Sequence, residues 1–137
     1  MKIKMLFSGI LTLIFLSGAS IQSFSQDKKE TQVFTVVEEM PKFEGKDIKH
    51  FNKWVLSNVK YPKEALEAGI SGKVFASFVV AKDGSVQDVK IKKGTNKLLN
   101  NEVLRVVKSS PKWTPGKQKG KAVAVSITIP VTFSLSL

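Results

Sequence analysis

The side chains that could perform acid, base or nucleophilic chemistry are few in this sequence. Its 137 residues include no cysteine and a single histidine, His50. The absence of cysteine excludes disulfides, thiolate metal sites and cysteine nucleophiles, and a lone histidine has no second metal ligand beside it. No serine lies in a Gly-x-Ser-x-Gly turn, and no glycine-rich loop has phosphate-binding spacing. We therefore expect no catalytic residues, no cofactor and no metal site.

The acidic residues are not paired as acid–base catalysis requires. Glu38 and Glu39 are adjacent at the end of a predicted strand, so their side chains point to opposite sides of the extended chain. Glu64 and Glu67 can share a helix face, but next to Lys63 they are typical of a solvated surface. Nothing here combines a nucleophile, a base and an oxyanion site, so the sequence predicts a binding protein and not an enzyme.

Positive charge dominates the chain, and the N-terminus indicates where that charge acts. Lysine and arginine number 22 against 11 aspartates and glutamates, which gives a formal net charge of +11. Lys2 and Lys4 precede an apolar run, Met5–Leu16, and small residues follow it, as in a secretory signal peptide. We predict that residues 1–25 are such a peptide, cleaved after Ser25 or after Ala19. The alternative is an uncleaved membrane anchor.

Export changes which partners the charge favours. In a periplasm-like compartment a basic surface favours acidic peptides, anionic polymers or a membrane face, and a nucleic acid is not expected.

Behind this leader, residues 26–40 are predicted to be a short linker with one strand, and residues 41–137 one folded domain. Hydrophobic spacing and turn residues predict strands and helices in the order β–α–α–β–β–α–β. Helices and strands that are segregated along the chain in this way predict an α+β sandwich, with an antiparallel sheet packed by helices on one face. The predicted segments are Gln32–Glu38, Ile48–Val59, Lys63–Ala68, Val74–Val80, Val86–Lys93, Lys97–Ser109 and Val123–Leu137.

The last predicted strand is unusually long and regular. Every odd position from Val123 to Leu137 is apolar, and the even positions between them are small or uncharged. This alternation indicates a strand with one buried face. Pro130 stands at an even position and cannot donate a hydrogen bond, so either the strand lies at a sheet edge or has one free stretch, or its pairing ends at a bulge. Both interpretations stay open at this point.

From Tyr61 to Phe133 the chain resembles the C-terminal domain of the TonB family. The resemblance is carried by ordered short motifs: Tyr61-Pro62, Gly69-Ile70-x-Gly72, Asp83-Gly84-x-Val86, Pro111-x-Trp113-x-Pro115-Gly116-Lys117 and Pro130-Val131-x-Phe133. It implies a two-layer sandwich of a three-stranded antiparallel sheet, with a long C-terminal edge strand and two to three helices. It also implies a function: binding the TonB box, a transporter's short extended peptide, as an added strand.

Carried over by position, the resemblance implies two stretches that contact this peptide. The first is the edge of the C-terminal strand, comprising Val123, Ala124, Val125, Ser126, Ile127, Thr128 and Ile129. The second precedes Tyr61 and comprises Asn58, Val59 and Lys60, where a glutamine is familiar at the position of Asn58. A basic turn is expected to attract an acidic partner through Lys117, Lys119 and Lys121. If the edge assignment holds, Val125→Pro is expected to abolish peptide binding and leave the domain folded.

The chain departs from full TonB transducers in the length of its spacer. About 14 residues separate the apolar segment from Pro41, a reach of about 50 Å when fully extended, and they contain no proline-rich repeat. Three functions therefore stay open: a periplasmic binding module of TonB-dependent transport, an anchored minimal transducer, or a basic domain that binds an anionic cell-envelope polymer. Contact with inner-membrane motor subunits and formation of a homodimer are also open.

Overall fold

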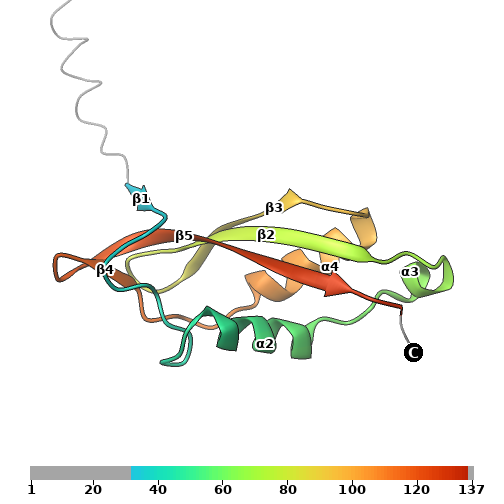
Figure 1. Ribbon diagram of the computed structural model, residues 1–137, viewed down its shortest axis with the longest axis horizontal. Coiled ribbons are helices and arrows are strands. Elements are labelled where there is room, and N and C mark those ends of the chain that lie inside the picture. The colour runs from blue at the N-terminus through green and yellow to red at the C-terminus, as the bar shows by residue number, and fades with distance from the viewer. Residues whose placement is uncertain (1–31, 136–137) are drawn as a thin grey trace, which may run out of the picture. The chain divides into compact units, whose positions relative to one another are not determined.

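The computed structural model describes residues 32–135, and the predicted signal peptide, residues 1–25, lies outside them (Figure 1). Apart from the short strand β4, the described part has its strands and helices in the order that the sequence predicts, which confirms the α+β class. Three helices are present, and their bounds agree with the predicted ones to within about two residues. The elements are β1 (Val33–Phe34), α2 (Ile48–Asn58), α3 (Lys63–Glu67), β2 (Gly72–Val80), β3 (Val86–Lys93), α4 (Lys97–Lys108), β4 (Gly116–Gln118) and β5 (Lys121–Phe133).

The sheet has the order β1-β5-β2-β3, and its centre is the predicted antiparallel set of β2, β3 and β5. β5 pairs with β2 without a register shift, from Val125 opposite Val80 to Phe133 opposite Gly72. Two short strands, β1 and β4, extend this centre on the β5 side. β1 is parallel to β5, so the sheet is mixed and has five strands, instead of the three antiparallel strands predicted.

The N-terminal strand and the basic turn differ from their predictions. The strand expected over Gln32–Glu38 is only two residues long, because the chain then leaves β5 to pair Glu39 with Lys117. The expected turn at 117–121 is a hairpin, since Lys119 and Gly120 both have positive φ (53° and 77°). Such a two-residue turn matches the twist of paired strands.

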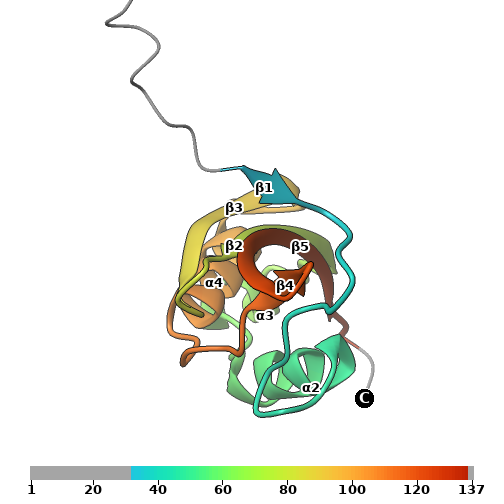
Figure 2. The same cartoon turned by 90° about the vertical axis from the view of Figure 1, so that its left-hand side faces the viewer.

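Helices α2 and α4 pack against one face of the curved sheet, and the opposite face stays uncovered by helices (Figure 2). Both α2 and α4 begin at a side-chain cap. The Asp47 carboxylate accepts a hydrogen bond from the Lys49 amide at 3.0 Å, and the Asn96 side chain accepts one from Leu98 at 2.8 Å. These caps satisfy backbone donors that a helix leaves unpaired at its first turn.

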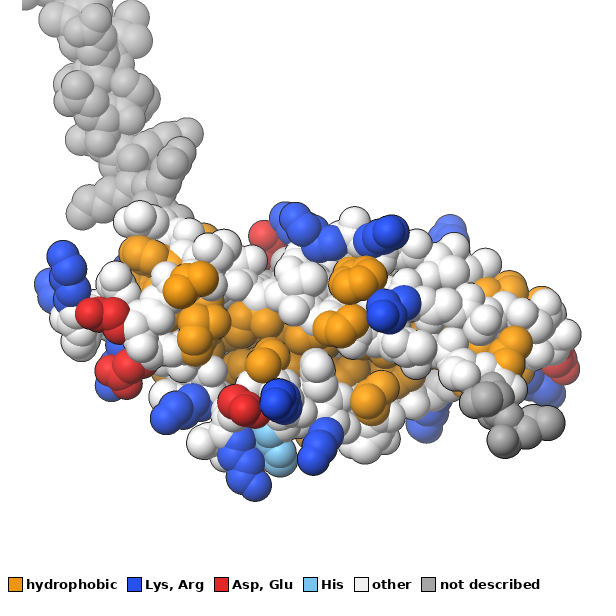
Figure 3. Space-filling view, viewed as in Figure 1, with side chains coloured by type: hydrophobic (Ala, Val, Ile, Leu, Met, Phe, Trp, Pro, Cys, Tyr) orange, Lys and Arg blue, Asp and Glu red, His pale blue; other side chains and the backbone are white. Residues whose placement is uncertain are grey.

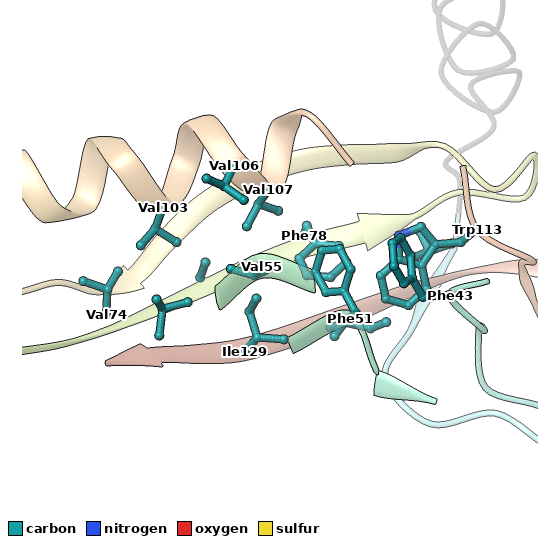
Figure 4. Close-up of a cluster of buried hydrophobic side chains, with 14 of the residues drawn as sticks. Phe43, Phe51, Val55, Val74, Phe78, Val103, Val106, Val107, Trp113 and Ile129 are labelled. Carbon is teal, nitrogen blue, oxygen red and sulfur yellow. The ribbon is translucent and has the colours of Figure 1, made fainter. Parts of the chain in front are cut away.

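An aromatic cluster fills the core between α2 and the sheet (Figure 4). Phe51 of α2 lies between Phe43, Phe78 and Trp113, with ring centroids 4.7–5.4 Å away. Trp113 is 4% exposed and therefore belongs to the core. Because Phe43 and Trp113 belong to irregular connections, the cluster fixes both connections to the sheet and to α2.

Candidate functional site: a strand edge beside a groove

The long strand β5 has one flank that is only partly covered. β2 lies along the other flank from Val125 to Phe133. On the flank away from β2, Ala124 and Val125 pair with β1, and no strand of residues 32–135 pairs beyond Val125. The predicted edge of residues 123–129 is therefore occupied at Ala124 and Val125, where β1 pairs with it. It is open from Ser126, and the opening continues to Phe133.

Pro130 shows which backbone groups face the open flank. It stands opposite Phe75 within a register that has no shift, so the bulge interpretation is wrong, and the strand has a free stretch on its other flank, beyond the residues that pair with β1. Opposite residues in an antiparallel pair alternate between hydrogen-bonded and non-hydrogen-bonded, and a proline can occupy only the second kind. The odd residues of β5 therefore bond to β2, and the even residues, such as Thr128 and Thr132, direct their N–H and C=O groups to the open flank.

This alternation changes the expectation for Val125→Pro. Val125 is an odd residue that pairs with Val80 of β2 and with Phe34 of β1, so both of its flanks are occupied. A proline there would break the bond to β2 and destabilise the sheet. Val125 therefore cannot separate peptide binding from folding, whereas Thr128, exposed and on the open flank, can.

The two outer edges of the sheet have opposite character. β3 pairs irregularly with β2, because the register shifts next to Phe75 and Ser77 of β2 and Asp88 of β3 has a positive φ (51°). β3 also carries three lysines: Lys90, Lys92 and Lys93. Bulges and lysines are the features with which proteins prevent further pairing at an edge. β5, by contrast, has no charged residue after Lys121. Only the β5 edge is therefore chemically suited to accept another strand.

A groove of about 680 Å³ lies beside the first part of this open edge. Figure 3 shows apolar side chains gathered in the band between β5 and α2, with charged side chains along its border. One wall is the edge itself, at Ser126–Thr128, and the other is the connection from Met40 to the start of α2 at Ile48. Met40 is 44% exposed, so its apolar side chain is available to a ligand, and Lys42 and Lys46 stand at the rim.

The wall opposite the edge is held rigidly. Phe43 and Lys46 exchange two backbone hydrogen bonds of 2.9 Å around a tight turn, in which Glu44 and Gly45 have positive φ (52° and 76°). Lys42 exchanges two more with Thr114, and the Phe43 ring is fully buried in the aromatic cluster. The groove therefore exists before any ligand arrives, which lowers the entropic cost of binding.

The second predicted stretch, Asn58–Lys60, lies at the C-terminal end of α2. Tyr61, the next residue, packs its ring edge-on against Phe133, with centroids 5.4 Å apart, so this stretch adjoins the far end of β5. Much of its polar backbone is already bonded. The Val59 amide donates to Val55, and the Lys60 amide donates to a Glu102 carboxylate oxygen at 2.7 Å. The structure does not place it at the groove.

Glu102 and Arg105 of α4 hold this stretch in place. Arg105 donates two hydrogen bonds to Glu102, of 2.9 and 2.6 Å, and a third of 3.3 Å to the carbonyl of Asn58. The bond from Arg105, followed by that from the Lys60 amide, holds the pKa of Glu102 below its ordinary value, against the opposing effect of burial. The side chain of Glu102 is only 12% exposed. The signal for this pair in the sequence is its spacing of three residues within a predicted helix.

The three predicted lysines stand together on the β4–β5 hairpin and are exposed. The backbone of Lys117 is paired with Glu39, and the Gln118 side chain accepts a hydrogen bond from the Glu38 amide. The outer flank of β4 is therefore covered, and only the side chains remain available: Lys117, Lys119 and Lys121. Among residues 32–135 no cluster of three or more metal-ligating His, Asp or Glu side chains occurs. No helix in that range is long and apolar enough to span a bilayer.

Sequence reasoning missed two parts of this site. One is the continuation of the open edge to Pro130 and Thr132, which the uncharged even positions already indicated. The other is the groove wall at Met40–Ile48, whose only signal was the Glu44-Gly45 turn before the Asp47 cap.

Comparisons with known proteins agree with this fold. The family model for the Gram-negative bacterial TonB protein C-terminal region matches residues 57–135. "Protein TonB" of two Helicobacter pylori strains is 37% identical over 82 residues, or 59% of this chain, and the chain spans 27% and 28% of the length of these relatives. Two solution structures of the Helicobacter pylori TonB C-terminal domain are 33% identical, with TM-scores of 0.51 and 0.55. They cover 66% of this chain and 95% and 81% of their own. The chain thus belongs to the TonB C-terminal family.

Proposed function

We propose that this protein binds an extended segment of a TonB-dependent outer-membrane transporter, which adds as a strand along Ser126–Phe133. The main observation in support is the open, uncharged flank of β5, where alternate residues present unpaired backbone groups. Membership of the TonB C-terminal family supports a non-enzymatic, periplasmic part in energy transduction for transport. Backbone hydrogen bonds would give affinity, and the side chains on each face of the added strand would give selectivity.

The absence of cysteine from the sequence gives a direct test. A cysteine introduced as Thr128→Cys is a unique thiol, and it can be oxidised against single cysteines placed in turn along a synthetic peptide. The peptide is copied from the periplasm-facing N-terminal segment of a transporter of the same cell. Residues that face each other across two strands have Cβ atoms about 4.5–5.5 Å apart, close enough for a disulfide with small adjustment.

Strand addition predicts that disulfides form only at alternate peptide positions. Moving the thiol from Thr128→Cys to Thr132→Cys is expected to shift the reactive position by four residues, and the direction of the shift reports the strand orientation. Leu56→Cys is the matched control, since Leu56 is 57% exposed on α2 and away from the edge. Equal reactivity at all peptide positions, or equal reactivity with Leu56→Cys, would contradict the proposal.

A second function, binding of an anionic cell-envelope polymer, is favoured only by the exposed lysines of β3 and of the β4–β5 hairpin. The dependence of binding affinity on salt concentration distinguishes the two functions. Electrostatic binding to a polymer weakens steeply as ionic strength rises, whereas a hydrogen-bonded strand is much less affected.

A further inference from the structure

The groove beside β5 has a wall that the family resemblance does not explain. The family match begins at residue 57, and the wall from Thr35 to Ile48 precedes it. We propose that this groove is a pocket for one large apolar side chain of the strand that adds to β5. The inference rests on the proposed strand addition and assigns to it a position that determines which peptides bind.

The direction of side chains in a sheet selects the peptide residue involved. Residues directly opposite each other on neighbouring strands point to the same face of the sheet. Ile127 is buried toward the helical layer and lines the groove, while Ser126 and Thr128 point to the uncovered face. The peptide residue paired with Ile127 therefore directs its side chain into the groove, between the β5 edge and the start of α2.

The chemistry of the groove fits an apolar side chain and disfavours a basic one. Met40, Pro41, Ile48 and Ile127 supply the apolar surface, and Met40 is flexible enough to adapt to different shapes. Lys42 and Lys46 at its rim outnumber the single carboxylate of the lining, Asp47, so the net charge around the groove repels a lysine or arginine in that place. The groove volume of about 680 Å³ lies within the range of ligand pockets, so a leucine or phenylalanine side chain can enter.

The test measures peptide affinity for the protein purified from cell envelopes in its processed form. Each position of the transporter peptide is replaced in turn by Leu, Ala and Lys, and binding is measured by fluorescence anisotropy. At one position Leu is expected to bind about tenfold more tightly than Ala, as for a side chain that loses about half of its apolar surface to the groove. Met40→Glu is expected to remove this preference, so that the Leu and Ala peptides bind with equal affinity.

Two further variants make the result specific. Val36→Glu is the matched control, because Val36 is 78% exposed in the same connection but does not line the groove, and it is expected to retain the preference. Lys46→Glu is expected to raise the affinity of the Lys peptide several-fold. Val36 and Lys46 are both exposed, so neither substitution should unfold the protein. Circular dichroism checks that each variant is folded.

The outcomes separate this inference from the proposed function. If alternate-position disulfides form at Thr128→Cys but Met40→Glu leaves every preference unchanged, strand addition stands and the pocket is refuted. If no such disulfides form, the proposed function fails and the pocket fails with it. If the preference vanishes on dilution together with a dimer seen by analytical ultracentrifugation, the groove belongs to a second copy of this chain, and the inference is overturned.

Discussion

A proline at position 128 is expected to weaken peptide binding without destabilising the fold, whereas a proline at position 127 is expected to destabilise the fold itself. The two positions are adjacent, but the alternation set by Pro130 directs their amides to opposite flanks. Thr128 presents its N–H to the open edge and its side chain to solvent. Ile127 bonds to β2 opposite Phe78 and is 8% exposed. The prediction therefore tests the geometry of the site and its function together.

The expected magnitudes follow from what each proline removes. Thr128→Pro removes no bond to β2, so the free energy of unfolding should change by less than about 1 kcal/mol. In the complex it removes a donor and leaves a peptide carbonyl unsatisfied, which costs about 1–3 kcal/mol, or about a 5- to 150-fold loss of affinity. Ile127→Pro loses a sheet hydrogen bond and a buried side chain, and should cost about 3 kcal/mol or more of stability.

Urea denaturation followed by tryptophan fluorescence measures stability, and anisotropy of a labelled transporter peptide measures affinity. Thr128→Ala is the control, because it keeps the amide and should bind as the unchanged protein does. If Thr128→Pro loses as much stability as Ile127→Pro, the assigned alternation is wrong. If it is folded and binds normally, the peptide does not use this edge.

Three more predictions concern Gly84 in the turn between β2 and β3, Glu102 of α4, and the lysines of the β4–β5 hairpin. Gly84 has a φ of 88°, and a Cβ there would lie 2.0 Å from the Trp113 carbonyl oxygen, so Gly84→Ala should lower the free energy of unfolding by about 3 kcal/mol or more. Gly69 also has a positive φ (70°) but no atom within 4 Å of such a Cβ, so Gly69→Ala should lower it by about 1 kcal/mol. Urea denaturation measures both. Glu102→Gln should lower the free energy of unfolding by about 1 kcal/mol at pH 7. Because the pKa of Glu102 is lowered in the folded protein, below its ordinary 4.5, the stability difference between the two proteins should disappear as pH falls through that lowered pKa. Stability curves measured against pH check this. Stopped-flow measurements at low salt should show slower association with an acidic transporter peptide, but unchanged dissociation, when glutamine replaces Lys117, Lys119 and Lys121.

The order of elements could be predicted because it depends on local patterns. The alternation in β5, the Asp47 cap and the Gly84 turn each act within a few residues, and each is present where the sequence places it. The two short strands could not be predicted in the same way. β1 and β4 consist of two and three residues, too few for a periodic pattern, and they form because distant segments supply their partners.

The site was predictable only in part for the same reason. That β5 has an open edge follows from its uncharged even positions and from Pro130, both local features. Where the opening begins depends on β1, which crosses from about 90 residues earlier in the chain to pair with Ala124 and Val125. The groove depends on the burial of Phe43 against Trp113, a contact between two irregular connections. No pattern within either connection indicates it.

Strand addition by itself is a weak source of affinity at this edge. An added peptide bonds to β5 only through every second residue, and Pro130 provides no donor at one of those positions. Each hydrogen bond contributes about 1 kcal/mol net, whereas ordering each peptide residue costs about 1–2 kcal/mol of conformational entropy. Because the backbone bonds cannot offset this cost, side-chain burial must supply the remaining free energy. The rigid groove beside Ser126–Thr128 is the part of the edge that offers such burial, so affinity should depend more on the residue facing Ile127 than on peptide length.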